Sequence, residues 1–250
     1  MVTWRNTWKE IEDSGVTTAV VTVGSTEQHG THLPLDTDTL IAERFAQMVA
    51  EELNAYLTPS IPVGQSDDWL EFPGSLSFSA DTLRAIITDI VASLVKTGFT
   101  TIVFVSIHGA NEVVYRGFPE QLEQQHPGVR IFTAGYPFWV RESWARIWTE
   151  AETECGIAKV HHADEGETSL ILSLFPELVG DSPTDCPLPE DYWPEGSKRK
   201  AYPYGSMGFP SKATKEKGDR MWQALLRRAL NNLKSQMGTA ESAPLWRQPL

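Results

Sequence analysis

Cysteine is scarce in this chain, which has two, Cys155 and Cys186, among 250 residues. Secreted disulfide scaffolds need more cysteines and are usually shorter, so we expect a cytoplasmic protein with reduced thiols. Long apolar runs are also missing, and the N-terminus has no signal-peptide pattern, so we expect no membrane span or secretory leader. Basic residues are fewer than acidic residues, and the resulting net charge of -12 argues against nucleic acid or anionic lipid as a partner.

The remaining composition is that of an ordinary globular protein, with 41% hydrophobic and 22% charged residues. A chain of this length can form one domain over residues 1–250. Apolar strand-like runs alternate with segments of helical spacing. Strands are expected at 17–24, 56–63 (interrupted by Pro59 and Pro62), 100–107 and 129–134, and helices at 38–53, 79–96, 111–125 and 212–236. This alternation predicts an α/β three-layer sandwich with a mostly parallel central sheet flanked by helices.

Titratable side chains are concentrated in the loop that follows the first long strand. Glu27 and His29 lie two residues apart, and Asp38 follows at the start of the next predicted helix. Carboxylate and imidazole suit Zn²⁺, Mn²⁺ or Fe²⁺, and in an extended loop the first two side chains point the same way. An alternative is that Glu27 and Asp38 cap helices and His29 is a surface residue. The density of the cluster favours a metal site.

Two further polar clusters follow at other element boundaries. His108 comes directly after the strand at 100–107, followed by small residues and Asn111, which could also be a helix cap. The third cluster contains His161, His162, Glu165 and Glu167 before an apolar helical run. The helix dipole explains acidic residues in a first turn but not paired histidines, which can act as general acids or bases. Because sites form at the carboxyl ends of parallel strands, the clusters predict one metal-dependent hydrolase site.

Four motifs in the same order resemble those of the creatininase (creatinine amidohydrolase) family over nearly the whole chain. They are Glu27-Gln-His-Gly with the downstream Leu-Pro and Asp38, Phe72-Pro-Gly-Ser75, His108-Gly-Ala-Asn111, and His162-Ala-Asp-Glu-Gly-Glu167-Thr-Ser. The resemblance implies a three-layer α/β fold, a centre with two divalent metal ions (Zn, Mn or Fe) and a homo-oligomer, often a hexamer.

The resemblance also implies a set of metal ligands. Glu27, Asp38 and His108 would hold one ion, and His29, Asp38 and one more carboxylate would hold the other. Creatininase proper has a ligand Glu shortly after its strand-end histidine, where this chain has Gly109 and Ala110. The missing carboxylate is therefore expected from Glu167 or Glu165, and we favour Glu167 because its Glu-Thr-Ser element matches across the family.

The remaining site residues are assigned in the same way. We expect His162 and Glu165 to be catalytic. We expect Ser75, Asn111 and His161 to bind substrate. The segment 158–162 corresponds to the stretch that serves the substrate in creatininase. Only its last residue, His162, matches that stretch, so we expect a substrate other than creatinine.

The sequence therefore predicts a metal-dependent amidohydrolase that cleaves a C–N bond of a small cyclic amide or formamide. One alternative is a metallopeptidase that trims a short cofactor-precursor peptide, because residues 35–39 resemble that branch of the family, although Glu165 does not fit it. These two readings differ in the pocket expected from the aromatic residues at 136–148 and near Trp193. A further alternative is a non-catalytic, metal-binding interaction protein.

Overall fold

The computed structural model describes residues 1–111, 117–134, 144–157, 162–187 and 195–238. Its core is a five-stranded sheet in the order β1-β3-β2-β4-β5, and every neighbouring pair is parallel. The strands are β1 (Val2–Thr3), β2 (Thr18–Thr22), β3 (Tyr56–Leu57), β4 (Thr101–Val105) and β5 (Arg130–Thr133). The predicted α/β class with a parallel sheet is confirmed.

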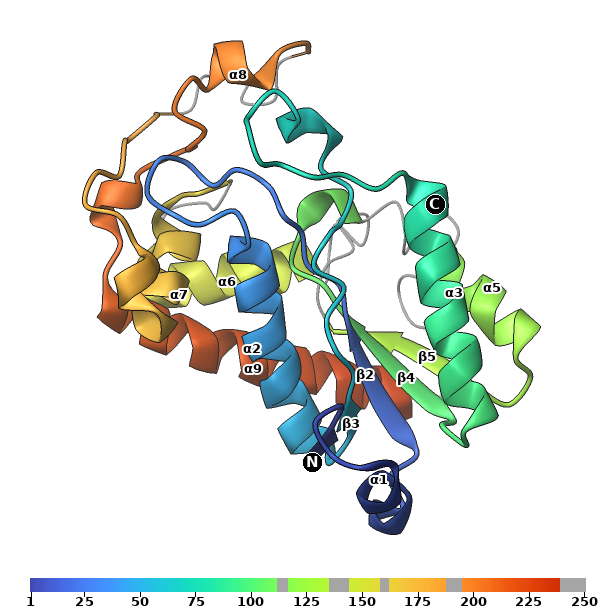
Figure 1. Cartoon of the computed structure of the whole chain (residues 1–250). Helices are drawn as coiled ribbons and strands as arrows, with labels where there is room; N and C mark the ends of the chain where they lie inside the picture. The colour runs from blue at the N-terminus through green and yellow to red at the C-terminus, as the bar shows by residue number, and fades with distance from the viewer. Residues whose placement is uncertain (112–116, 135–143, 158–161, 188–194, 239–250) are drawn as a thin grey trace.

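Helices cover both faces of this sheet (Figure 1). On one face lie α3 (Ala80–Lys96) and α5 (Phe118–Gln125); on the other lie α2 (Thr37–Leu53), α6 (Trp144–Cys155), α7 (Glu165–Leu174) and α9 (Lys215–Gly238). Successive β2 side chains alternate between the layers, with Ala19 and Val21 in the core under α3 and Val20 in the core under α2. The three-layer arrangement is therefore confirmed. A short helix, α1 (Trp8–Ser14), precedes β2.

Proline shortens the second predicted strand. A strand was expected over 56–63, but β3 ends at Leu57, and beyond it a single parallel bridge joins Ile61 to Val23. Pro59 and Pro62 have no N–H to donate to a ladder, so the pairing is interrupted there. The chain leaves the sheet early and forms a loop over its carboxyl edge.

Another difference from the expected elements also lies beside the carboxyl edge of the sheet. The helix expected over 111–125 is a 3₁₀ turn, η2 (Gly109–Asn111), followed by α5, with 112–116 outside the described residues. The segment 181–211 contains a short helix, α8 (Lys198–Ala201), while 188–194 lie outside the described residues.

The start of α7 is fixed by a side-chain cap and by close packing on α9. Asp164 is the N-cap, and its carboxylate accepts from the N–H of Gly166 at 2.8 Å. A Cβ added to Gly218 of α9 would lie 1.9 Å from the carbonyl oxygen of Ser169, so glycine allows the two helices to touch. This crossing positions the first turn of α7 over the carboxyl edge of the sheet.

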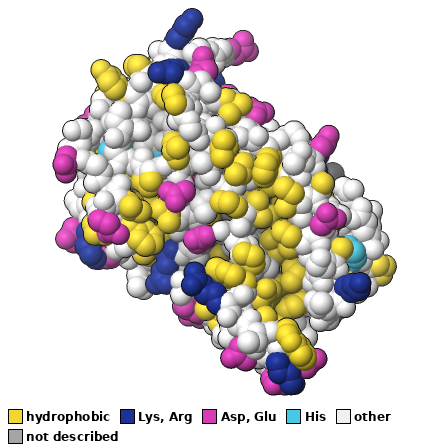
Figure 2. All heavy atoms as spheres, viewed as in Figure 1, with side chains coloured by type: hydrophobic (Ala, Val, Ile, Leu, Met, Phe, Trp, Pro, Cys, Tyr) yellow, Lys and Arg dark blue, Asp and Glu magenta, His cyan; other side chains and the backbone are white. Residues whose placement is uncertain are grey.

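Among the described residues, no helix has both the length and the apolar character needed to cross a bilayer. Apolar side chains gather along the middle of the face in Figure 2, with acidic and basic side chains around them. The homo-oligomer and the cytoplasmic location expected from the sequence stay predictions.

Candidate metal centre

Five buried polar side chains gather at the carboxyl edge of the sheet. Glu27 and His29 follow β2, and His108 follows β4. Asp38 lies in the first turn of α2, and Glu167 lies in the first turn of α7. None of the five residues is more than 8% exposed. The structure thus brings together residues from three separate sequence clusters.

Asp38 lies at the centre of this set. Its Oδ1 is 3.3 Å from His29 Nε2, and its Oδ2 is 2.8 Å from His108 Nδ1. The hydroxyl of Ser25 donates to the same Oδ2 at 2.7 Å, which fixes the carboxylate plane. One carboxylate oxygen is therefore directed to each histidine.

The five side chains form two overlapping groups that share Asp38. Glu27 Oε1 lies 3.4 Å from His108 Nδ1, and Glu167 Oε2 lies 3.7 Å from His29 Nε2. Within each group the possible ligand atoms all lie within 4.8 Å of one another: the groups are Glu27, Asp38, His108 and His29, Asp38, Glu167. Each group offers two carboxylates and one imidazole, a suitable ligand set for a divalent transition metal.

The two imidazoles present their free nitrogens to the carboxylates. His29 Nδ1 donates to the carbonyl of Glu27 at 3.1 Å, and His108 Nε2 donates to the carbonyl of Gln65 at 2.7 Å. Metal-binding histidines are usually held in this way, through the ring nitrogen that does not face the ion. Glu27 Oε2 and His29 Nε2 are buried without a hydrogen-bond partner. A bound cation would satisfy both atoms, so the residues fit a metal.

The pKa values of the five side chains in the cluster are shifted strongly from their ordinary values. Burial raises the pKa of Glu27 to about 7 and that of Glu167 to about 7. Burial lowers the pKa of His29 and of His108, but the nearby carboxylates outweigh it and raise these values to about 10 and about 9. For Asp38, burial is outweighed by the two histidines, which hold its pKa well below the usual value. The buried carboxylates therefore need positive charge beside them.

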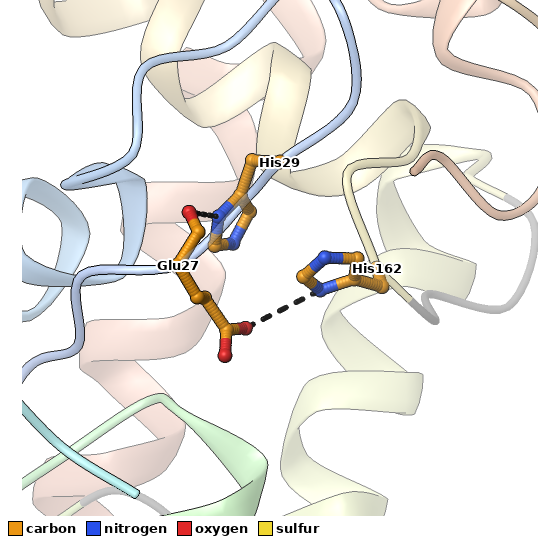
Figure 3. Close-up of side chains that lie close together, drawn as sticks. All are labelled: Glu27, His29 and His162. Carbon is orange, nitrogen blue, oxygen red and sulfur yellow. Dashed lines mark hydrogen bonds and ion pairs between the residues drawn. The ribbon is translucent and has the colours of Figure 1, made fainter. Parts of the chain in front are cut away.

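His162 lies beside these groups and faces Glu27 (Figure 3). Its Nδ1 is 3.6 Å from Glu27 Oε1, and its Nε2 lies 2.7 Å from the carbonyl oxygen and 2.8 Å from the side-chain nitrogen of Gln28. The imidazole stacks on Trp69 with ring centroids 4.2 Å apart. Burial and the positive charge on His29 lower the pKa of His162 well below the ordinary value. The ring is therefore neutral, and its Nδ1 lies on the side of Glu27.

Glu165 is placed differently from Glu167. Its buried carboxylate pairs with the ammonium of Lys217, which also donates to the carbonyl of Lys212 at 2.9 Å. Glu165 belongs to none of the three ligand-type groups found among the described residues, whereas Glu167 belongs to one of them. The catalytic role expected for Glu165 stays a prediction.

The three residues expected to bind substrate lie in different settings. The hydroxyl of half-buried Ser75 accepts from the backbone N–H of Gln28 at 3.0 Å. Asn111 is fully buried, and its amide bonds to neighbouring loops. His161 lies outside the described residues, as do Trp193 and the side chains of 136–148.

Four contacting residues were not expected from the sequence. Ser25 orients Asp38, Gln65 holds His108 through its carbonyl, Trp69 stacks on His162, and Lys217 pairs with Glu165. The position of Ser25 directly after a strand, two residues before Glu27, is a usable signal. The other three act through a backbone atom, a ring face or a distant helix, for which a single sequence gives no sign.

Carboxylates and imidazoles that converge at the carboxyl edge of a parallel sheet, beside a neutral histidine, form a site typical of metal-dependent hydrolases. Comparison with known families agrees with that class. The family model described as creatininase, creatinine amidohydrolase, matches residues 4–233. The chain therefore belongs to the creatininase family, whose members are hydrolases that act on carbon–nitrogen bonds.

The individual relatives of this chain have different named activities. The mycofactocin precursor peptide peptidase of Mycobacterium ulcerans (strain Agy99) is 31% identical over 83% of this chain and 80% of its own. The creatinine amidohydrolase of Pseudomonas putida is 28% identical over 85% of this chain and 88% of its own. The solved structure of creatininase with Mn has a TM-score of 0.78 and 23% identity, and covers 94% of this chain and 98% of that one. This structural likeness supports the fold.

Proposed function

We propose that this chain hydrolyses a C–N bond in a small cyclic amide or formamide with two divalent metal ions. The observation that carries the proposal is the pair of three-ligand groups that share Asp38. In it, Glu27, Asp38 and His108 hold one ion, while His29, Asp38 and Glu167 hold the other. Zn²⁺, Mn²⁺ and Fe²⁺ all accept this ligand set.

Bound at these groups, the ions would supply a water of lowered pKa and polarise the carbonyl of an amide. The chain itself supplies orientation and a proton carrier. The neutral imidazole of His162 is fixed by Gln28 on one side and by Trp69 on its face. Its Nδ1 can accept a proton at the site and return it to the leaving nitrogen.

Trimming of a short peptide is the second candidate function. It is supported by the 31% identity to a mycofactocin precursor peptide peptidase, together with the resemblance at residues 35–39. The candidate uses the same ligands and the same proton carrier, so the two functions differ in substrate alone. We keep the cyclic amide or formamide as the first candidate because the family match is to creatinine amidohydrolase.

Metal content and a substrate panel test this proposal. Untagged protein purified without chelator is analysed by elemental mass spectrometry, and the same sample is assayed on cyclic amides, formamides and short peptides. Two transition-metal ions per chain with turnover of a panel member would support the proposal, and the panel would separate the two functions. If the protein stays metal-free after incubation with Zn²⁺ or Mn²⁺, the proposed centre is wrong; bound metal without turnover would favour a binding protein.

Replacing Glu167 and Glu165 separately should give opposite results. We expect Glu167→Gln to reduce the metal content to about one ion per chain, because one carboxylate of one group is lost. We expect Glu165→Gln to keep both ions and to lower the free energy of unfolding by about 1.5–3 kcal/mol, because the partly buried ammonium of Lys217 loses its negatively charged hydrogen-bond acceptor. Elemental analysis and urea denaturation of both variants measure the two effects. Loss of an ion from Glu165→Gln alone would reverse the assignment.

A further inference from the structure

Asn111 lies where three loops of the carboxyl edge meet. It is the last residue of η2, and its side chain is completely buried. The loops after β2, β3 and β4 all reach it, through Gly24, Gln65 and Ser106 respectively. Two of these loops carry metal-ligand candidates, so the position of Asn111 bears directly on the candidate metal centre.

Every polar atom of the Asn111 side chain is engaged by the protein. Its Nδ2 donates to the carbonyl of Gly24 at 2.9 Å and to the hydroxyl of Ser106 at 3.1 Å. Its Oδ1 accepts from the backbone N–H of Gln65 at 3.0 Å. Both amide protons and the amide oxygen are therefore used within the fold.

The amide also lies directly against the backbone of Gly64. A Cβ added at Gly64 would lie 2.4 Å from Asn111 Oδ1 and 2.6 Å from the carbonyl oxygen of Gly24. A glycine at this position therefore lets the loop after β3 approach the amide. This packing and the complete burial leave no surface of Asn111 for a substrate atom.

A continuous set of hydrogen bonds runs from Asn111 to His108. Gln65 donates its N–H to Asn111 Oδ1, and its carbonyl accepts from His108 Nε2 at 2.7 Å. Because the Nε2 proton is directed to that carbonyl, the ring presents Nδ1 to Asp38 Oδ2, 2.8 Å away. The backbone of Gln65 is thus held on one side by Asn111 and holds His108 on the other.

We infer that Asn111 is a positioning residue that holds Gln65, and through it the Nε2–H of His108, so that His108 Nδ1 faces the metal ion. The inference rests on the proposed metal centre, and it gives Asn111 a different role from the substrate contact expected from the sequence. Partners of this kind typically change metal affinity 10–100-fold when they are removed. We therefore expect the group that contains His108 to depend on Asn111 more strongly than the other group.

Zinc competition titrations test this difference in two matched backgrounds. Glu167→Gln leaves the group with Glu27, Asp38 and His108, whereas Glu27→Gln leaves the group with His29, Asp38 and Glu167. Asn111→Ala should weaken zinc binding at least about tenfold in the first background and no more than about threefold in the second. An equal loss in both backgrounds, or a change below about twofold in the first, would overturn the inference.

The hydrogen-bonded proton of His108 gives a readout that does not require metal. In ¹⁵N-histidine-labelled protein, which has six histidines, the Nε2–H signal of His108 is assigned by comparison with His108→Ala. We expect this proton to exchange slowly in the unsubstituted protein, with or without zinc, and rapidly in Asn111→Ala. Unchanged exchange would overturn the inference. A protein that binds no zinc but shows the expected change would instead contradict the proposed function alone.

Ser169→Ala controls for a general loss of stability. Ser169 is also completely buried, and its hydroxyl bonds to the carbonyl of Glu165 and to the N–H of Thr214, without contact to His108. In Ser169→Ala, the Nε2–H proton of His108 should exchange as slowly as in the unsubstituted protein. If Asn111→Ala does not fold, Asn111→Leu takes its place, since it has a similar shape but cannot accept from the N–H of Gln65. The same two outcomes then decide the inference.

Discussion

Replacing Asp38 with alanine should remove both metal ions from the protein. Its two oxygens face different histidines, at 3.3 Å from His29 Nε2 and 2.8 Å from His108 Nδ1, so each three-ligand group loses a member. A group reduced to one carboxylate and one imidazole has too few protein ligands for a stable transition-metal site. Elemental mass spectrometry of the purified variant measures the loss.

Asp36 provides a matched control for that substitution. It lies two residues earlier, is exposed, and makes no side-chain hydrogen bond as the residue that precedes α2. Asp36→Ala should therefore keep the full metal content, although it also removes one acidic residue from the same helix start. An Asp38→Ala protein that retains one ion would show that a single group suffices without the shared carboxylate, and the two-ion centre proposed above would be wrong.

Loss of Asp38 also has an electrostatic consequence in the metal-free protein. The carboxylate is the largest of the charges that raise the pKa of His29 above its ordinary value against the effect of burial, and it also raises that of His108. Without it, the effect of burial is opposed less strongly, and both imidazoles lose protons at lower pH. Two neutral buried imidazoles are tolerated more readily than two buried charges without partners. The variant should therefore fold, which makes the metal measurement interpretable.

The main strands and the layers could be predicted because their residues are buried on both faces. The run at 17–24 contains β2 and the run at 100–107 contains β4, because continuous β-branched and apolar residues are typical of the centre of a parallel sheet. The strand expected at 56–63, with its interruptions at Pro59 and Pro62, is paired in β3 only as far as Leu57. The two prolines cannot donate a hydrogen bond to the neighbouring strand, so the pairing ends although the residues that follow are apolar.

The candidate site was predictable to the extent that its residues are close in sequence or follow a strand. Glu27 and His29 are two residues apart in one loop, and His108 directly follows a strand. The choice between Glu165 and Glu167 was different. Two residues apart on a helix, they point to nearly opposite sides, so one of them faces the cluster and the other faces away. Which one does so depends on how α7 packs on α9, where Lys217 pairs with Glu165.

Replacing His162 with alanine should lower kcat by about 10²–10⁴-fold and leave the metal content unchanged. The imidazole is neutral and is fixed by Gln28 and by Trp69, with Nδ1 on the side of Glu27. A general base held in this way is lost completely on truncation, whereas both three-ligand groups of the proposed centre stay intact. The kcat is measured on the best substrate from the panel, and KM should change much less than kcat because His162 is proposed to act on the proton transfer.

His126 offers a histidine control for this measurement. It ends α5, ahead of β5, and so lies toward the amino edge of the sheet, opposite the site. His126→Ala should keep both metal content and turnover. Two results would contradict the assignment in different ways. A His162→Ala enzyme with ordinary kcat would remove the proposed proton transfer, whereas a variant that has lost an ion would make His162 a ligand, as the third group with Glu27 and His29 would allow. In that case, the proton carrier would have to be sought among the remaining buried acids of the site.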